Sequence, residues 1–183
     1  MSAEFLNPVR GIRGMAVTPH ALASQSALAI LRDGGNAVEA MIAAAATIAA
    51  VYPHMNSIGG DGFWLISRPG EEPVGIEACG AAASAATIDA YRAHGLQSIP
   101  FRGPLAANTV AGTVSGWALA HRWSTDALDG KLPVARLLED AIVYAGGGIP
   151  VTRSQSECVA LKRDELESVA GFAETFLDRR AHV

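Results

Sequence analysis

The sequence predicts an α+β domain in which several helices pack around a short β-hairpin. Half of the 183 residues are hydrophobic and only 17% are charged, so a packed core is expected. Apolar helical patterns alternate with one pair of short strand-like segments, 63–67 and 74–78, separated by a turn-rich stretch. A two-stranded hairpin alone is marginally stable, so we expect strands from elsewhere to complete the sheet.

Two helices are predicted to open the chain. The first runs from Thr18 to Leu31, with Thr18 as its cap and Pro19 in its first turn, and it ends at Gly34-Gly35. Asn36 caps the second, 37–51, whose apolar character extends nearly all round, so it must be covered on every side. Its most apolar part is about a dozen residues long, whereas a membrane span needs ~20, so we interpret it as a buried helix.

The remaining pattern is mostly helical. A short helix is expected from Thr87 to His94, with Gly95 as its stop, and residues 96–111 are expected to be irregular. Further helices are predicted from Gly112 to Trp123 and from about Thr152 to Leu166. The clearest amphipathic helix is predicted over 133–145, where these apolar residues fall at helical spacing: Val134, Leu137, Leu138, Ala141, Ile142 and Ala145.

Composition excludes several classes of function. The net charge is -4 and the basic residues are scattered, which opposes nucleic-acid binding. Cys79 and Cys158 are too far apart in sequence for a CxxC site and too few for a disulfide framework, so we interpret them as free thiols. No metal site is predicted, because the five histidines show no HxH or HxxxH spacing: His20, His54, His94, His121 and His182.

The two ends of the sequence bear on localisation and length. Met1 to Arg13 is polar and mixed, without an apolar run, so no secretory signal is predicted and the cytoplasm is the expected compartment. A periplasmic location would follow if an upstream signal had been removed. Residues 178–183 are unlike the end of a domain, which favours truncation.

The glycine cluster Ile58-Gly59-Gly60-Asp61-Gly62 has the composition of a phosphate loop but the wrong context. Phosphate loops follow a strand and open a helix, whereas this cluster follows a helix and opens a strand. We therefore interpret it as a turn in which glycines permit positive φ or tight backbone contact. No GxSxG elbow surrounds Ser115, so a triad containing His54 and Asp61 is not supported.

Several motifs occur in one order along the chain. They are Ala23-Ser24-Gln25, Ile30 to Ala40 with its central Gly34-Gly35-Asn36-Ala37-Val38, Pro53-His54, Ile58 to Phe63, and Gly112 to Trp117. The series resembles the opening of the γ-glutamyltransferase (γ-glutamyltranspeptidase) family over about residues 14–171, closer to its oxamate amidohydrolase- and acylase-like members than to its γ-glutamyl enzymes.

The resemblance implies an N-terminal-nucleophile hydrolase with an αββα sandwich, of which this chain supplies helices and a few strands. Family members are proenzymes that cut themselves to expose a threonine, whose α-amine serves as its base. Residues 1–183 are then one domain, the N-terminal portion of the large subunit, with a small subunit carrying the threonine as partner. No cofactor is implied.

Two departures from the family pattern set the expectations about activity. No Thr-Thr-His-like motif occurs, and Thr18-Pro19-His20 comes too early, so no catalytic residue is expected on this chain and it should be inactive alone. Cys79 stands at or near the position of the arginine that holds the γ-glutamyl carboxylate, and a thiol cannot make that bidentate pair. Arg102 is the candidate carboxylate anchor from another loop.

The predicted function is therefore cleavage of a small carboxylate-bearing, oxamate-like amide through an acyl-enzyme. Two alternatives stay open at this point. One is a γ-glutamyl hydrolase or transferase acting on glutathione-like substrates. The other is a truncated, non-catalytic family member that serves as a structural or binding module.

Overall fold

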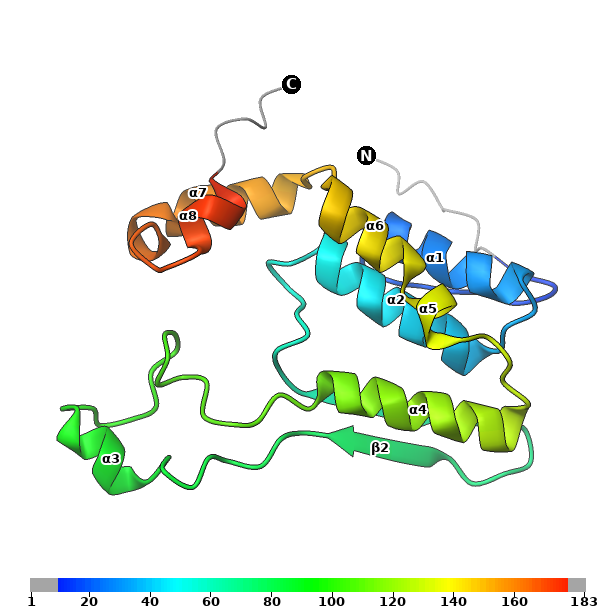
Figure 1. Cartoon of the computed structure of the whole chain (residues 1–183), viewed down its shortest axis with the longest axis horizontal. Coiled ribbons are helices and arrows are strands. Elements are labelled where there is room, and N and C mark those ends of the chain that lie inside the picture. Colours follow the sequence, from blue (N-terminus) through cyan, green and yellow to red (C-terminus); the bar gives the residue numbers. More distant parts are fainter. Residues whose placement is uncertain (1–9, 178–183) are drawn as a thin grey trace, which may run out of the picture.

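The computed structural model describes residues 10–177, so the predictions made for residues 1–9 and 178–183 lie outside the described range. Within it, helices surround a single two-stranded sheet, as Figure 1 shows. The elements are α1 (Ala21–Arg32), α2 (Ala37–Val51), β1 (Gly62–Ile66), β2 (Val74–Ala78), α3 (Ile88–Ala93), α4 (Thr113–Leu128), α5 (Val134–Leu137), α6 (Glu139–Gly147), α7 (Arg153–Leu166) and α8 (Phe172–Phe176).

The turn between α1 and α2 forms as predicted. Gly34 takes a φ of +90° after the last turn of α1, a conformation that favours glycine. The side chain of Asn36 then accepts hydrogen bonds from the backbone N–H groups of Val38 and Glu39, while the Glu39 carboxylate accepts one from Asn36 N. This reciprocal capping box fixes the start of α2.

The start of α1 differs from the prediction. The helix begins at Ala21 and is capped by His20, whose Nδ1 accepts a hydrogen bond from Leu22 N at 3.2 Å. The hydroxyl of Thr18 donates instead to the carbonyl of His20 at 2.6 Å. Thr18 as the cap was therefore wrong, because its side chain bonds a carbonyl before the helix and not a free N–H inside it.

Helix α2 is covered on several sides, but not on every side as predicted, since Met41 is 41% exposed. It packs against α1, α4 and α6 (Figure 1), and its residues contribute most of the core. Small side chains permit this close approach. The buried apolar residues of α2 are Val38, Ala40, Ile42, Ala43, Ala44, Ala46 and Val51.

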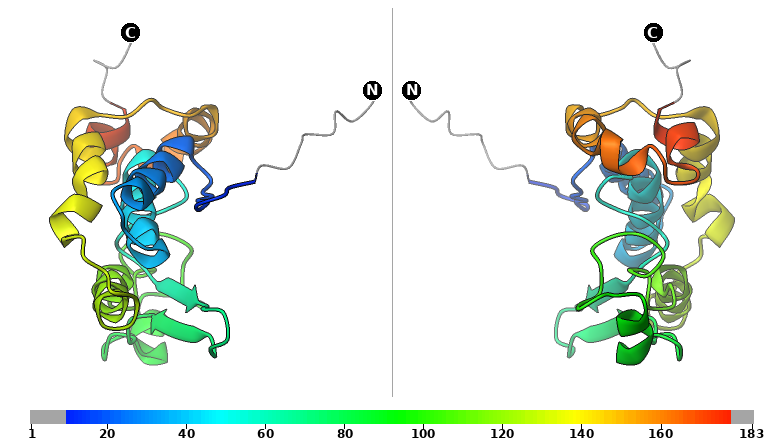
Figure 2. Two further views of the ribbon diagram at one scale, coloured as in Figure 1. Left: turned by 90° about the vertical axis from the view of Figure 1, so that its right-hand side faces the viewer. Right: turned by 90° about the vertical axis from the view of Figure 1, so that its left-hand side faces the viewer.

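The hairpin has one covered face and one open face. Strands β1 and β2 pair antiparallel, with Gly62 opposite Ala78 and Ile66 opposite Val74. Its inner face packs on α4, where Ala78 lies against Gly116. The outer face carries Phe63 and Leu65, which are 72% and 81% exposed. Figure 2 shows the hairpin at the edge of the molecule.

A buried polar network joins α2 to α4 and to the segment after it. Asn36 Nδ2 donates to Ser124 Oγ at 2.7 Å, and Leu132 N donates to Glu39 Oε1 at 2.8 Å. Ser124 lies beyond Trp123, where the sequence predicted that this helix ends. The extra turn of α4 therefore brings the partner of Asn36 into the core.

The predicted single helix over 133–145 is two helices, α5 and α6, which meet at Leu138. Arg136 pairs with Asp33 at 2.6 Å and so fixes α5 to the end of α1, whereas α6 runs along α2. The predicted helix over 133–145 therefore packs as two pieces, α5 against the end of α1 and α6 against α2. Only Leu137 of this pattern is fully buried, and Ile142 is 63% exposed.

Helices α7 and α8 and the arm formed by α3 and residues 94–111 lie away from the main core (Figure 1). Thr152 caps α7 as expected, through a bond from Gln155 N at 3.2 Å. The sequence did not predict α8. The short α3 is capped by Thr87 as predicted, and the expected stop residue Gly95, whose φ is +74°, follows its C-cap His94.

Candidate functional site

The glycine cluster is hydrogen-bonded to the start of α4. The carbonyl of Gly60 accepts hydrogen bonds from Gly112 N (3.1 Å), Thr113 N (3.0 Å) and Thr113 Oγ1 (2.7 Å). These contacts confirm a structural turn before β1. They also satisfy N–H groups that a helix leaves free at its first turn, in place of a side-chain cap.

We expected these glycines to be needed for positive φ or tight backbone contact, and this was wrong for Gly59 and Gly60. Neither has a positive φ, and a Cβ on Gly60 would meet nothing within 4 Å. The crowded glycines are Gly80 and Gly112. Their added Cβ atoms would lie 1.5 Å from Val110 O and 2.1 Å from Ala78 O. The chain crosses itself there so closely that only glycine fits.

This crossing places Cys79 at the end of the hairpin, on an exposed surface. Continuing the register by one step puts Asp61 across from Cys79, and Glu77 lies two residues before it on the same face of β2. Partial desolvation raises the pKa of the Cys79 thiol, and the carboxylates of Asp61 and Glu77 raise it further. The thiol is therefore a neutral group in an anionic corner.

A shallow groove of about 480 Å³ borders Cys79. One wall is the end of β2 with residues 79–81, and the other is α4 with Ser115, Leu119 and Arg122. Residues 110–112 also line the groove. Arg122 is a cation that the sequence reasoning did not single out, and its place beside β2 depends on the packing of α4 against the sheet.

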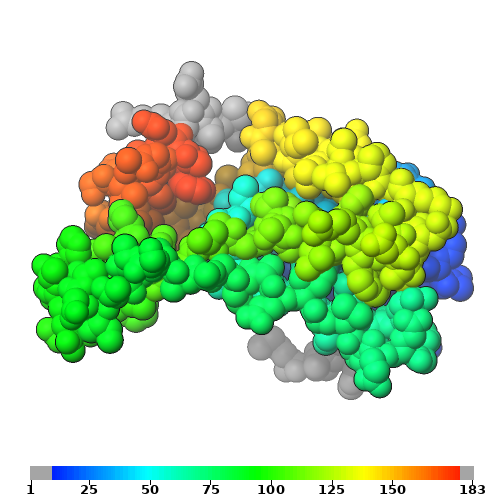
Figure 3. Space-filling model, turned by 60° about the horizontal axis from the view of Figure 1, so that its bottom comes forward, coloured from blue at the N-terminus to red at the C-terminus, as the bar shows by residue number. Residues whose placement is uncertain are grey.

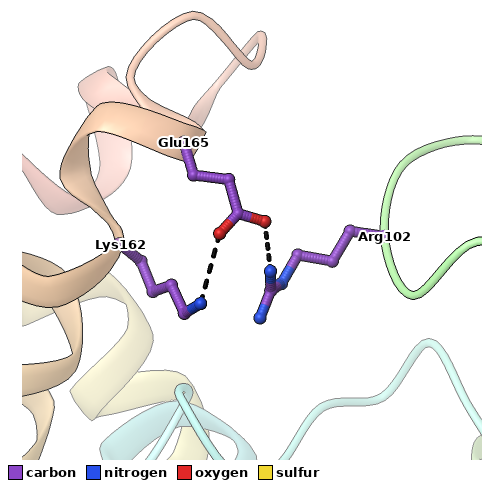
Figure 4. Close-up of polar contacts among 3 residues, drawn as sticks. All are labelled: Arg102, Lys162 and Glu165. Carbon is purple, nitrogen blue, oxygen red and sulfur yellow. Dashed lines mark hydrogen bonds and ion pairs between the residues drawn. The ribbon is translucent and has the colours of Figure 1, made fainter.

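Arg102 lies on the irregular segment 96–111, away from that groove. Figure 4 shows its guanidinium bonded to the Glu165 carboxylate of α7, which Lys162 also contacts at 3.2 Å. Hydrogen bonds from Arg102 and then Lys162 lower the pKa of Glu165. Arg102 is not among the residues that line the groove beside Cys79. The structure thus does not bring the two predicted substrate-binding residues together.

His54 and Asp61, declined as parts of a triad, are also not joined by any hydrogen bond of the described residues. The His54 ring packs on Tyr52, with 4.2 Å between ring centroids, and neither of its buried nitrogens has a partner in the described chain. The carboxylate of Asp61 instead lies close enough to Cys79 to raise the pKa of its thiol. The hairpin register could have revealed this placement from the sequence, once strand 74–78 was aligned with strand 62–66.

Residues 10–177 include no cluster of three or more His, Cys, Asp or Glu side chains that could hold a metal ion. None of the helices in this range has both the length and the apolar character that crossing a bilayer requires.

Solved structures that superpose on this chain give its class: an α+β portion of an N-terminal-nucleophile hydrolase fold. The γ-glutamyltranspeptidase of Helicobacter pylori superposes with a TM-score of 0.80 at 27% identity, covering 92% of this chain and 48% of that one. A cephalosporin acylase from Bacillus halodurans gives a TM-score of 0.74 at 31% identity, covering 91% of this chain and 31% of that one.

The gamma-glutamyltranspeptidase family model matches residues 23–183, and the chain belongs to this family. It is 63% identical to an oxamate amidohydrolase proenzyme of Klebsiella pneumoniae subsp. pneumoniae, over 90% of this chain and 31% of that protein. It is 38% identical to the glutathione hydrolase-like YwrD proenzyme of Bacillus subtilis, over 93% of this chain and 31% of that protein. The chain thus spans about a third of the length of these relatives.

Proposed function

We propose that this chain is the N-terminal part of the large subunit of an N-terminal-threonine amidohydrolase that cleaves a small carboxylate-bearing amide of the oxamate type. The observation that carries the proposal is the anionic corner around Cys79. It stands where the resemblance places the arginine that holds a γ-glutamyl carboxylate. The 63% identity to an oxamate amidohydrolase proenzyme supports the same substrate class.

The electrostatics of the corner oppose a γ-glutamyl substrate for two reasons. A neutral thiol at position 79 cannot donate the paired hydrogen bonds that a guanidinium gives a carboxylate. In addition, Asp61 and Glu77 place negative charge next to that position, which repels any carboxylate held there, so the proposed binding site for the oxamate carboxylate lies elsewhere. Loss of the ion pair alone corresponds to about 30- to 1000-fold in kcat/KM.

The proposed reaction needs a threonine from the small subunit. Its hydroxyl attacks the amide carbon, ammonia leaves, and the acyl ester is hydrolysed by water to release the diacid. No metal or organic cofactor enters these steps. The contribution of this chain is the scaffold and part of the substrate pocket. Arg102 and the position of Cys79 are the proposed substrate-binding residues.

Assays with two substrates distinguish this proposal from the alternative, a hydrolase of γ-glutamyl compounds. The complete hydrolase that contains this chain is assayed for ammonia release from oxamate and for p-nitroaniline release from γ-glutamyl-p-nitroanilide. We expect the higher kcat/KM with oxamate. Charge removal in Asp61→Asn/Glu77→Gln should raise kcat/KM for the γ-glutamyl compound, whereas Glu72→Gln, an exposed charge in the hairpin turn, should not. A higher kcat/KM for the γ-glutamyl compound in the unmodified enzyme would overturn the proposal.

The second candidate is a glutathione-type hydrolase, and it is favoured by the relatives of that name. The YwrD relative is 38% identical, and a glutathione hydrolase proenzyme of Pseudomonas aeruginosa is 35% identical over 78% of this chain. This candidate requires a carboxylate anchor other than residue 79, for which Arg102 and Arg122, which lines the groove beside Cys79, are candidates. The same pair of assays decides between the two.

A further inference from the structure

Helix α1 is capped by a side chain that can take up a proton near neutral pH. The usual caps are Asn, Asp, Ser and Thr, whose oxygens accept hydrogen bonds throughout this range. In α1 the acceptor is Nδ1 of His20, which accepts a hydrogen bond from Leu22 N at 3.2 Å. The N–H groups of Ala23 and Ser24 bond instead to the backbone carbonyl of His20, at 3.1 and 3.2 Å. The side-chain cap of α1 therefore depends on one ring nitrogen.

This hydrogen bond fixes the protonation state of the ring. A neutral imidazole has one donor nitrogen and one acceptor nitrogen, whereas both nitrogens of an imidazolium are donors. Since Nδ1 of His20 accepts from Leu22 N, the ring is neutral and its proton is on Nε2. A proton on Nδ1 would turn the hydrogen bond into a contact between two N–H groups. The Leu22 N–H in the first turn of α1 would then lack its partner.

The charges around the start of α1 do not offset a protonated ring. The N-terminal end of a helix carries a partial positive charge, so a cation there is unfavourable. The first turn of α1 contains no acidic residue. Within residues 10–177, His20 also takes part in no ion pair. An imidazolium at position 20 would thus lose its hydrogen bond and gain no carboxylate partner.

His20 lies where the start of α1 meets the end of α2. The ring centroid of Tyr52, the C-cap of α2, is 6.0 Å from that of His20. His54 packs on Tyr52 in turn, with 4.2 Å between centroids. The Tyr52 hydroxyl lies 3.5 Å from Ser154 Oγ of α7 (orange in Figure 3), which a hollow separates from α6 (yellow). The titratable groups on the α2 side of His20 are therefore Tyr52 and, beyond it, His54, and neither is a carboxylate.

We propose that His20 makes the start of α1 sensitive to acid, so that protonation of its ring opens the cap and loosens the first turn of the helix. Histidine is the side chain whose ordinary titration falls between about pH 5 and 8, so mild acid is sufficient. The change is conformational and reversible, and it involves no substrate. It is therefore separate from the proposed function, and an amidase assay does not decide it.

Hydrogen exchange in the complete hydrolase that contains this chain tests the proposal. Exchange in a peptide that spans residues 19–26 is followed by mass spectrometry at about pH 7.5 and about pH 5.5, and corrected for intrinsic rates. We expect its protection to fall about fivefold in acid, the loss that corresponds to one helix cap. His20→Asn provides a cap that does not titrate, so its protection should change less than about twofold.

His94→Asn is the matched control. His94 is the C-cap of α3, where a cation is favourable, and His54 is retained in both variants. His94→Asn should therefore keep the full acid response of residues 19–26. An equal acid response in the unmodified hydrolase and in His20→Asn would refute the proposal, and so would loss of the response in His94→Asn.

A second measurement needs no variant that could fail to fold at neutral pH. In the hydrolase labelled with ¹³C and ¹⁵N in histidine, His20 should have its proton on Nε2 at neutral pH, identified by its contact with Leu22 N–H. A neutral ring with its proton on Nδ1 would overturn the proposal, because that nitrogen could not accept the hydrogen bond. If His20→Asn does not fold, His20→Ser, which also caps without titrating, takes its place in the exchange experiment.

Discussion

Replacing Glu39 with glutamine should destabilise the fold far more than a single change of one atom suggests. The side chain of Glu39 is 1% exposed and no cation pairs with it in the described residues. Its Oε2 accepts a hydrogen bond from Asn36 N at 2.9 Å, and its Oε1 accepts one from Leu132 N at 2.8 Å. One carboxylate thus joins the start of α2 to the segment after α4, which is 93 residues away.

The magnitude follows from the number of acceptors. Glutamine keeps the volume but has one oxygen, so one of the two N–H groups then faces an NH₂ group. A hydrogen bond to a charged acceptor contributes about 1.5–3 kcal/mol, and a buried donor left unpaired adds a further cost. Relief of the buried charge offsets part of this loss. We expect Glu39→Gln to lower the free energy of unfolding by about 2–3 kcal/mol.

Urea denaturation followed by circular dichroism provides the measurement. With a slope of about 1–3 kcal/mol per molar urea, the midpoint should fall by roughly 1 M or more. Glu157→Gln is the matched control, because Glu157 makes only an exposed pair with Arg153 on α7, which contributes about 0.5 kcal/mol or less. Equal midpoints for the two variants would refute the bridging role of Glu39.

Three further outcomes follow from the site. Gly80→Ala should destabilise the protein severely, because its added Cβ would clash with Val110 O. Gly75→Ala should not, because its Cβ would meet nothing within 4 Å. The urea midpoints of the two variants test this difference. Removing the carboxylates in Asp61→Asn/Glu77→Gln should lower the raised pKa of Cys79 and so speed its alkylation at pH 8. The rate is measured in a Cys158→Ser background, so that only Cys79 can react. An unchanged alkylation rate contradicts the anionic corner. Because the pKa of Glu165 is lowered, its pairing with Arg102 should be complete above the ordinary carboxyl pKa and lost as pH falls through the lowered value. Hydrogen exchange in residues 96–107 should then become faster at low pH. An exchange pattern that does not change with pH, after correction for intrinsic rates, contradicts this prediction.

The features that sequence reasoning predicted correctly are those determined by a few neighbouring residues. The capping box of Asn36 and Glu39 spans four positions, and Gly34 stops α1 through its own backbone freedom. The strand bounds of β2 also follow from a local alternation of side chains. In each case the competing structures differ within one turn of the chain, so local preferences decide the outcome.

The features that it missed depend on contacts between distant segments. Beside the break at Leu138, Arg136 pairs with Asp33, which is 103 residues away. In the part of α4 beyond its predicted end, Ser124 accepts a hydrogen bond from Asn36. Helical periodicity contains no information about either partner. The anionic corner was missed for a simpler reason, because Asp61 and Cys79 are neighbours only through the hairpin register.

The two proposed substrate-binding residues are not equally ready to hold a carboxylate, and this difference can be tested. The position of Cys79 repels one, whereas Arg102 already holds the carboxylate of Glu165. Binding of a substrate carboxylate at Arg102 therefore exchanges one ion pair for another, so Glu165 competes with the substrate. If Arg102 is the anchor, Glu165→Gln in the complete hydrolase should lower KM for oxamate and leave kcat nearly unchanged. Glu157→Gln, which neutralises a neighbouring charge on α7, should change neither constant. If KM stays constant or rises in Glu165→Gln, Arg102 serves to fasten segment 96–111 to α7, and the substrate carboxylate must be bound by another cation.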